Sequence, residues 1–126
     1  MKRDLDLVRN ILVTAEKSDG PVDAGTLLNC CSDLRVIAFH VELMRENGLI
    51  RADVEYDGLA DAPMDVTVDG ITWDGYDYLD AIRSDKVWRK ANDAISSSVG
   101  DTSLSVVKET CTMVATELIK TSLGIK

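Results

Sequence analysis

Residues 47–79 read NGLIRADVEYDGLADAPMDVTVDGITWDGYDYL and contain two segments with the pattern of paired strands. Apolar and charged residues alternate from residue 50 to residue 57, and residues 64–69 repeat this period of two, which is typical of half-buried strands. The turn residues Gly58 and Pro63 lie in the short segment between them and favour a reversal of the chain. The stretch therefore predicts an antiparallel β-ribbon, the wing of a winged helix-turn-helix.

The sequence before and after the ribbon predicts helices. Residues 4–17, 23–31 and 33–48 each begin with an aspartate that can cap a helix, followed by apolar residues at helical spacing. The second and third segments meet at a polar turn, which predicts a helix-turn-helix, and Gly48 ends its second helix. Thr72 is expected to cap the next helix. The predicted fold class is mainly α with a small antiparallel β-ribbon, a winged helix-turn-helix followed by C-terminal helices.

The last part of the chain predicts an amphipathic helix that begins at Asp101 or Thr102. We expect residues 1–96 to form the winged helix-turn-helix with its following helix, and residues 97–126 to form this last helix of the same domain. Its apolar stripe must be buried, either against the first helix or against a second copy of the chain. The dimerisation candidates on the stripe are Leu104, Val107, Cys111, Val114 and Leu118.

Composition excludes several functional classes. No apolar run has the length of a membrane span, and the N-terminus lacks the features of a signal peptide, so we expect a cytoplasmic protein without a membrane partner. The cysteines Cys30, Cys31 and Cys111 are too few for a disulfide framework and are expected to be reduced. The sequence contains no nucleotide-binding loop, nucleophile elbow or metal motif. We therefore expect no enzyme, no catalytic residue, no cofactor and no metal site.

The formal net charge of −8 is concentrated in one part of the chain. Residues 51–80 hold nine carboxylates against the single base Arg51, a local balance of −8. The acidic residues of the ribbon alternate with its apolar residues, so we expect them on its solvent face. Such a face would repel DNA, because phosphate contacts need basic or neutral hydrogen-bond donors.

Four motifs carry a resemblance to a known family. They read KRDLDL at residues 2–7, HVELM at 40–44, ENGLI at 46–50 and ITWDGYDYLD at 71–80, with Trp88 downstream. Over residues 2–90 the chain resembles a bacterial family described as a domain of unknown function, found largely in phages and prophages. The resemblance implies a winged-helix fold and no established activity. Ile71 stands where such motifs usually carry Leu, which is a volume-conserving difference.

The first functional hypothesis is a non-catalytic protein that binds the basic surface of a protein partner. Carboxylates on a rigid ribbon favour fast, salt-sensitive association with a positively charged protein. For a relative of phage proteins, a host nucleic-acid-handling or defence factor is a natural target. The predicted contact residues, called the acidic wing below, are Asp53, Glu55, Asp57, Asp61, Asp65 and Asp69.

The alternative hypothesis is a DNA-binding transcriptional regulator that acts as a dimer. Helix-turn-helix proteins usually place their second helix in the major groove of double-stranded DNA. The residues that would read DNA are Ser32, Arg35, His40 and Arg45. His40 has a competing structural interpretation, because a helical histidine near a turn usually makes one local hydrogen bond and packs its ring. Trp73 and Trp88 could form an exposed binding platform, but at a helix start and in a helix interior they are more often core residues, which is what we expect here.

Overall fold

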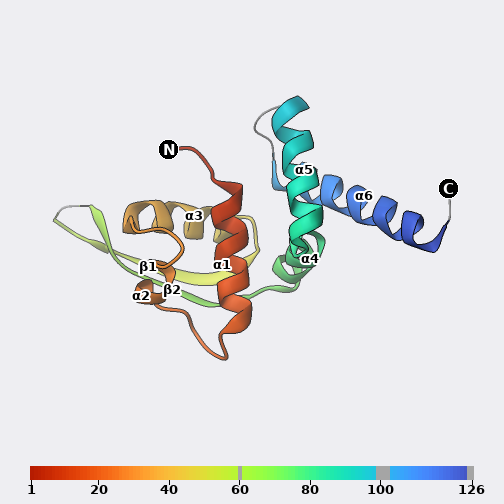
Figure 1. The fold of residues 1–126 in the computed structure, drawn as a ribbon. Coiled ribbons are helices and arrows are strands. Elements are labelled where there is room, and N and C mark those ends of the chain that lie inside the picture. The colour runs from red at the N-terminus through yellow and green to blue at the C-terminus, as the bar shows by residue number, and fades with distance from the viewer. Residues whose placement is uncertain (60, 99–102, 125–126) are drawn as a thin grey trace. The chain divides into compact units, whose positions relative to one another are not determined.

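The computed structural model describes residues 1–59, 61–98 and 103–124 and forms two compact units, Met1–Asp77 and Tyr78–Lys126. Its elements, labelled in Figure 1, are α1 (Leu5–Lys17), α2 (Ala24–Leu27), α3 (Leu34–Glu46), β1 (Ile50–Asp57), β2 (Ala62–Ile71), α4 (Trp73–Ile82), α5 (Asp85–Ser98) and α6 (Leu104–Leu123). The predicted fold class is confirmed: the chain is mainly helical with a two-stranded antiparallel sheet and C-terminal helices, consistent with a small winged-helix-like fold. The boundary between the two units falls within α4.

The first three helices begin where their capping aspartates predict. The side chain of Asp4 accepts hydrogen bonds from two backbone N–H groups of the first turn of α1, and those of Asp23 and Asp33 each accept one from α2 and α3. These bonds satisfy donors that have no partner within a helix. The short α2 ends at Leu27, before the predicted end at Cys31, so only its start was predicted correctly.

The ribbon buries the side that the alternation predicts. The facing pairs of this inner side are Ile50 with Ile71, Ala52 with Val68 and Val54 with Val66. The paired residues of β2 are buried, and both α1 and α3 contact the ribbon. In Figure 1 the ribbon extends beyond α3. Because side chains alternate between faces, the charged residues lie on the outer side, away from these helices.

Two irregularities in the register change the predicted pattern. The pairing shifts between Arg51 and Ala52, and again between Glu55 and Tyr56, which leaves Asp69 and Met64 of β2 as bulged residues without a facing partner. A bulge restores the inward direction of the next apolar residue, so Ile71 is buried. The period of two groups Met64 with Val66 and Val68, but the bulge leaves the Met64 side chain exposed whereas the two valines are buried.

A third piece of extended chain borders the ribbon and was missed in the sequence. Val22 pairs with Val68 as an antiparallel bridge, with backbone N–H to C=O distances of 2.8 and 2.9 Å in the two directions. A single bridging residue has no period to detect. It ties the segment between α1 and α2 to the edge of β2.

The corner that joins α3, β1 and α4 is held by backbone contacts. Gly48 adopts the left-handed conformation, with φ of 74°, that the sequence predicts at this helix end. The Thr72 hydroxyl donates to the carbonyl of Gly48, and the Thr72 N–H donates to the carbonyl of Leu49 at 3.1 Å. Gly75 is buried against that same Leu49 carbonyl, where an added Cβ would lie 1.9 Å from the oxygen. The start of α4 is therefore fixed on this corner.

The final helix differs from its prediction at two points. Its cap is Ser103, which accepts a hydrogen bond from the Val106 N–H at 3.3 Å, whereas the predicted caps at positions 101 and 102 lie outside the described residues. Val107 and Cys111 are fully buried and α6 contacts α5, so these two residues are not available to a second copy of the chain. The side chain of Leu104 lies outside the described residues. Val114 and Leu118 remain half-buried.

Candidate protein-interaction surface

The outer side of the ribbon carries opposed residues of the acidic wing. Glu55 faces Asp65 directly across the two strands, and Asp53 faces Thr67. The three carboxylates are exposed, and within residues 1–59, 61–98 and 103–124 none of them forms an ion pair. Like charges that face each other on a ribbon are mildly destabilising. Their presence here concentrates negative charge on a rigid surface that points into solvent.

The remaining residues of the acidic wing lie at the two ends of the ribbon. Asp69 is the exposed bulged residue near its base, and Asp61 lies in the loop with a positive φ of 51°. Asp57 is half-buried, and its carboxylate accepts a hydrogen bond from the Leu59 N–H at 2.9 Å. Asp57 therefore stabilises the turn and is the least available of the six predicted contact residues.

The one basic residue of the ribbon lies across its base. A Cβ added at Gly70 would lie 2.4 Å from the Nη2 atom of Arg51, so the guanidinium covers this glycine. Arg51 faces Gly70 across the strands, whereas Glu55 and Asp65 face each other four residues further along β1. At about 3.4 Å per residue, that spacing separates the two pairs by roughly 14 Å. The base of the ribbon is thus the only part of its outer side with a positive charge.

Two contacts connect the ribbon to α3. The Tyr56 hydroxyl donates a hydrogen bond to the Glu42 carboxylate, and this bond raises the pKa of Tyr56 to about 12, because ionised tyrosine could not donate it. The Arg45 guanidinium donates to the Ala52 carbonyl of β1 at 3.4 Å. These bonds orient the ribbon relative to α3.

The outward stripe of α3 is not basic. Arg35, Phe39, Glu42 and Glu46 follow one another at spacings of four, three and four residues, which places them on one side of a helix. The opposite side contains buried core residues such as Ile37 and Val41. One guanidinium against two carboxylates gives this stripe a net charge of −1.

The residues proposed to read DNA do not form one surface. Ser32 and Arg35 are exposed near the start of α3, and Arg45 is exposed in its last turn, about 15 Å of helix rise from Arg35. His40 is only 1% exposed, so the interpretation that it contacts DNA is wrong. Its Nε2 atom accepts from the Asp4 N–H at 2.8 Å, and its Nδ1 atom is 2.8 Å from the Val36 carbonyl. His40 thus joins α3 to the start of α1, a role close to the structural interpretation.

Several exposed apolar side chains were missed by the sequence reasoning. Leu59 in the ribbon loop is fully exposed, and Met64 near the start of β2 is also exposed. Trp73 is 82% exposed, so its prediction as a core residue is wrong, whereas Trp88 is buried as predicted. Interface cores are enriched in aromatic residues and methionine, which makes these exposed side chains candidates for contact with a partner.

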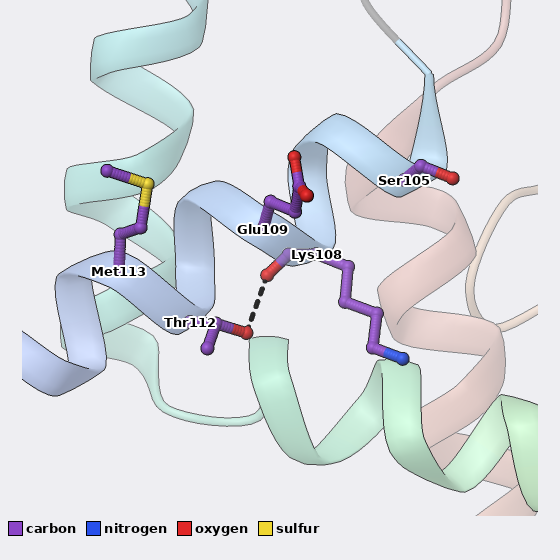
Figure 2. Close-up of a pocket in the computed structure, with 5 residues that line it drawn as sticks. All are labelled: Ser105, Lys108, Glu109, Thr112 and Met113. Atoms are coloured by element: carbon purple, nitrogen blue, oxygen red, sulfur yellow. Dashed lines mark hydrogen bonds between the residues drawn. The ribbon is translucent and has the colours of Figure 1, made fainter.

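The described residues also form hollows outside the ribbon. A hollow of about 610 Å³ lies along α6 and is lined by Ser105, Lys108, Glu109, Thr112 and Met113. Figure 2 shows that the Thr112 hydroxyl donates to the Lys108 carbonyl, an ordinary contact along one helix at 2.8 Å. In the described part of the chain, no three His, Cys, Asp or Glu residues are grouped to hold a metal ion. No described helix is long and apolar enough to cross a bilayer.

Comparison with known proteins places the chain in a family. It is 31% identical over 122 residues to an uncharacterized protein of Haemophilus influenzae, an alignment that covers 94% of this chain and 99% of that protein. No solved structure matches the chain. Residues 2–101, which include the ribbon and α1 to α5, match the model of one protein family. The chain therefore belongs to the family described as hypothetical protein (DUF2513).

Proposed function

We propose that this protein is a non-catalytic binding protein whose acidic wing contacts a basic surface on a protein partner. The observation that carries the proposal is the exposed, directly opposed pair Glu55 and Asp65 on the outer side of the ribbon, with Asp53 beside it. Opposed carboxylates cost stability in the isolated chain, and a cationic partner would convert that cost into attraction. A basic protein groove supplies such a partner.

The arrangement of the acidic wing suits rapid recognition. The ribbon is fixed to α3 by the Tyr56–Glu42 and Arg45–Ala52 hydrogen bonds, so its charges are preorganised. Preorganised charge increases the rate of encounter with an oppositely charged surface, and this effect weakens as salt is added. The exposed Leu59 and Met64 would add apolar contact at the end of the ribbon.

The partner that we infer is a host factor that handles nucleic acid or acts in defence against phages. Two considerations support this choice: the resemblance of the chain to phage and prophage proteins, and the basic surfaces with which nucleic-acid-binding proteins contact phosphates. In this proposal the acidic wing occupies a surface that normally faces a polyanion.

The alternative proposal is a dimeric transcriptional regulator. The order of α2, α3 and the ribbon favours it, as do the exposed Ser32 and Arg35 near the start of α3, the end with which recognition helices usually contact bases. Three observations weigh against it: the net negative stripe of α3, the burial of His40 and the absence of basic residues along the outer side of the ribbon beyond Arg51. We rank it second for these reasons.

Charge reversal on the ribbon tests the proposal. The combined changes Asp53→Lys, Glu55→Lys and Asp65→Lys, called the wing-reversed variant, raise the formal net charge from −8 to −2. The facing pair Glu55 and Asp65 becomes a facing pair of lysines, so the cross-strand repulsion and the fold are retained. Affinity capture from a bacterial lysate should retain a basic protein on the wild-type chain and lose it at least about tenfold on this variant.

A matched variant controls for net charge. Asp19→Lys, Asp93→Lys and Glu117→Lys change the total charge equally, at exposed positions outside the ribbon. This control should capture the same basic protein as the wild type. Equal capture by the wing-reversed variant would contradict the proposal, and equal loss in both variants would show that overall acidity and not the acidic wing carries the interaction.

A further inference from the structure

The first turns of α4 present an aromatic surface that no part of the acidic wing accounts for. Trp73 is 82% exposed and Tyr76 is 43% exposed. Residues three and four apart on a helix are neighbours, so Tyr76 and Asp77 both lie beside Trp73. We call these three residues the α4 platform. An indole group so exposed is unusual, because aromatic side chains bury large apolar areas when the fold allows it.

The direction of the α4 platform is fixed by the opposite side of the same helix turn. The Gly75 N–H donates to the Thr72 hydroxyl at 3.0 Å, and Gly75 itself is pressed against the Leu49 carbonyl. Gly75 is two residues after Trp73, which places it about 200° around the helix, almost directly opposite. Contact through Gly75 therefore turns Trp73 away from the core. The exposure of the indole is a consequence of the close packing at Gly75.

The charges around the α4 platform select the kind of side chain that it can bind. Asp74 and Asp77 are exposed carboxylates, and neither forms an ion pair among the residues that the structure describes. The face of an indole ring attracts cations, and among protein cations it favours guanidinium, which is planar and weakly hydrated. A carboxylate next to the ring can pair with the same guanidinium through two hydrogen bonds. The combination fits arginine better than lysine.

We propose that the α4 platform binds an arginine side chain of a basic protein partner, with the guanidinium stacked on Trp73 and paired with Asp77. This inference rests on the proposed function in that the partner is basic, and it adds a specific contact outside the ribbon. Contact residues of this kind, aromatic and arginine together, supply much of the affinity in protein interfaces. The acidic wing would then attract the partner and the α4 platform would select arginine.

Peptides of nine arginines and of nine lysines provide probes with equal charge. Titration of each into the full chain, followed by tryptophan emission, reports on Trp73 because Trp88 is buried. The wild type should bind the arginine peptide about fivefold more tightly than the lysine peptide, with a change in the emission of the exposed tryptophan. Trp73→Ala should bind both peptides equally when binding is measured by calorimetry, and Asp77→Asn should lose most of the preference.

The control is Met113→Ala, which removes an exposed apolar side chain of α6 and should leave the arginine preference unchanged. Far-ultraviolet circular dichroism of Trp73→Ala should match that of the wild type, since the indole has little buried area to lose. A fivefold preference that persists in Trp73→Ala would overturn the inference. A wild-type dimer that Trp73→Ala converts to a monomer would also overturn it, by assigning this surface to a second copy of the chain.

The wing-reversed variant separates this inference from the proposed function. It should bind both peptides more weakly and keep the fivefold ratio, because the α4 platform is unchanged. Weakened binding in the wing-reversed variant together with an unchanged ratio in Trp73→Ala would leave the proposed function standing and reject the arginine site. Normal binding in the wing-reversed variant, together with loss of the arginine preference in Trp73→Ala, would reject the role of the acidic wing and leave the arginine site standing.

Discussion

Gly75→Ala is expected to lower the free energy of unfolding by about 3 kcal/mol, as overpacking against backbone does. The added Cβ would lie 1.9 Å from the Leu49 carbonyl oxygen and 2.7 Å from the Cγ2 atom of Ile71. No side-chain rotation can move the carbonyl away, so the start of α4 must separate from the corner that it shares with α3 and β1. The higher helix propensity of alanine, about 1 kcal/mol, offsets only part of this cost.

Urea denaturation followed by circular dichroism measures this effect, and Gly25→Ala is its control. Gly25 also lies in a helix, but an added Cβ there would be 3.5 Å from the Asp23 carboxylate, an ordinary contact. The free energy of unfolding of the Gly25→Ala variant should stay within about 0.5 kcal/mol of that of the wild type. Equal stability of the Gly75 and Gly25 variants would contradict the close packing that turns Trp73 outward.

His40→Ala is expected to lower the free energy of unfolding by about 3 kcal/mol, because it leaves a cavity in place of the imidazole and removes a hydrogen bond. The imidazole packs edge-on against Phe39, with ring centroids 5.2 Å apart, and accepts from the Asp4 N–H. Asp4 in turn caps α1 with its carboxylate. Removal of the His40 side chain therefore destabilises the start of α1 as well as the core. The measurement is the same urea denaturation.

Two further variants separate packing from hydrogen bonding at this position. His40→Leu fills most of the volume but leaves the Asp4 N–H without its acceptor, whereas the side-chain oxygen of His40→Gln can accept from it. The leucine variant should be less stable than the glutamine variant by about 1 kcal/mol. A leucine variant as stable as the wild type would mean that the hydrogen bond to Asp4 has no net effect.

Local signals in the sequence predicted most of the regular structure correctly. Asp4, Asp23 and Asp33 were identified as caps because their side chains compensate unpaired N–H groups within one helical turn. The ribbon was identified from its period of two, and Gly48 from the left-handed conformation that it adopts. Each of these features depends on residues that are near one another in the chain.

The features that sequence could not predict depend on contacts between distant segments. The bridge from Val22 to Val68 joins residues 46 positions apart, and the bulge at Met64 depends on how two strands meet. Tryptophan is a residue type that is usually buried, and only the approach of Gly75 to Leu49 turns Trp73 outward. His40 was assigned to the DNA-reading set by its position in the helix, because burial against α1 leaves no trace in local spacing.

At the candidate site too, features that depend on local patterns were predicted from the sequence, and features that depend on contacts in the folded chain were not. The alternation of charge predicted the outer carboxylates Asp53, Glu55 and Asp65, which the structure places on the exposed side of the ribbon. It did not predict the turn-stabilising role of Asp57, because a carboxylate that accepts a backbone N–H looks the same in sequence as a free one. Nor did it predict that Val107 and Cys111 are buried in the chain, because a helical stripe does not identify its partner.

The most direct measurement is fluorescence anisotropy of a labelled pool of double-stranded DNA titrated with the purified protein, at low salt and near physiological salt. An acidic ribbon and a net negative α3 stripe predict no binding at either salt concentration, and they predict that the wing-reversed variant binds DNA at low salt because its lysines can contact phosphates. Wild-type binding that weakens steeply with salt and is lost in Arg35→Ala would contradict the acidic-wing proposal and support the DNA-binding regulator.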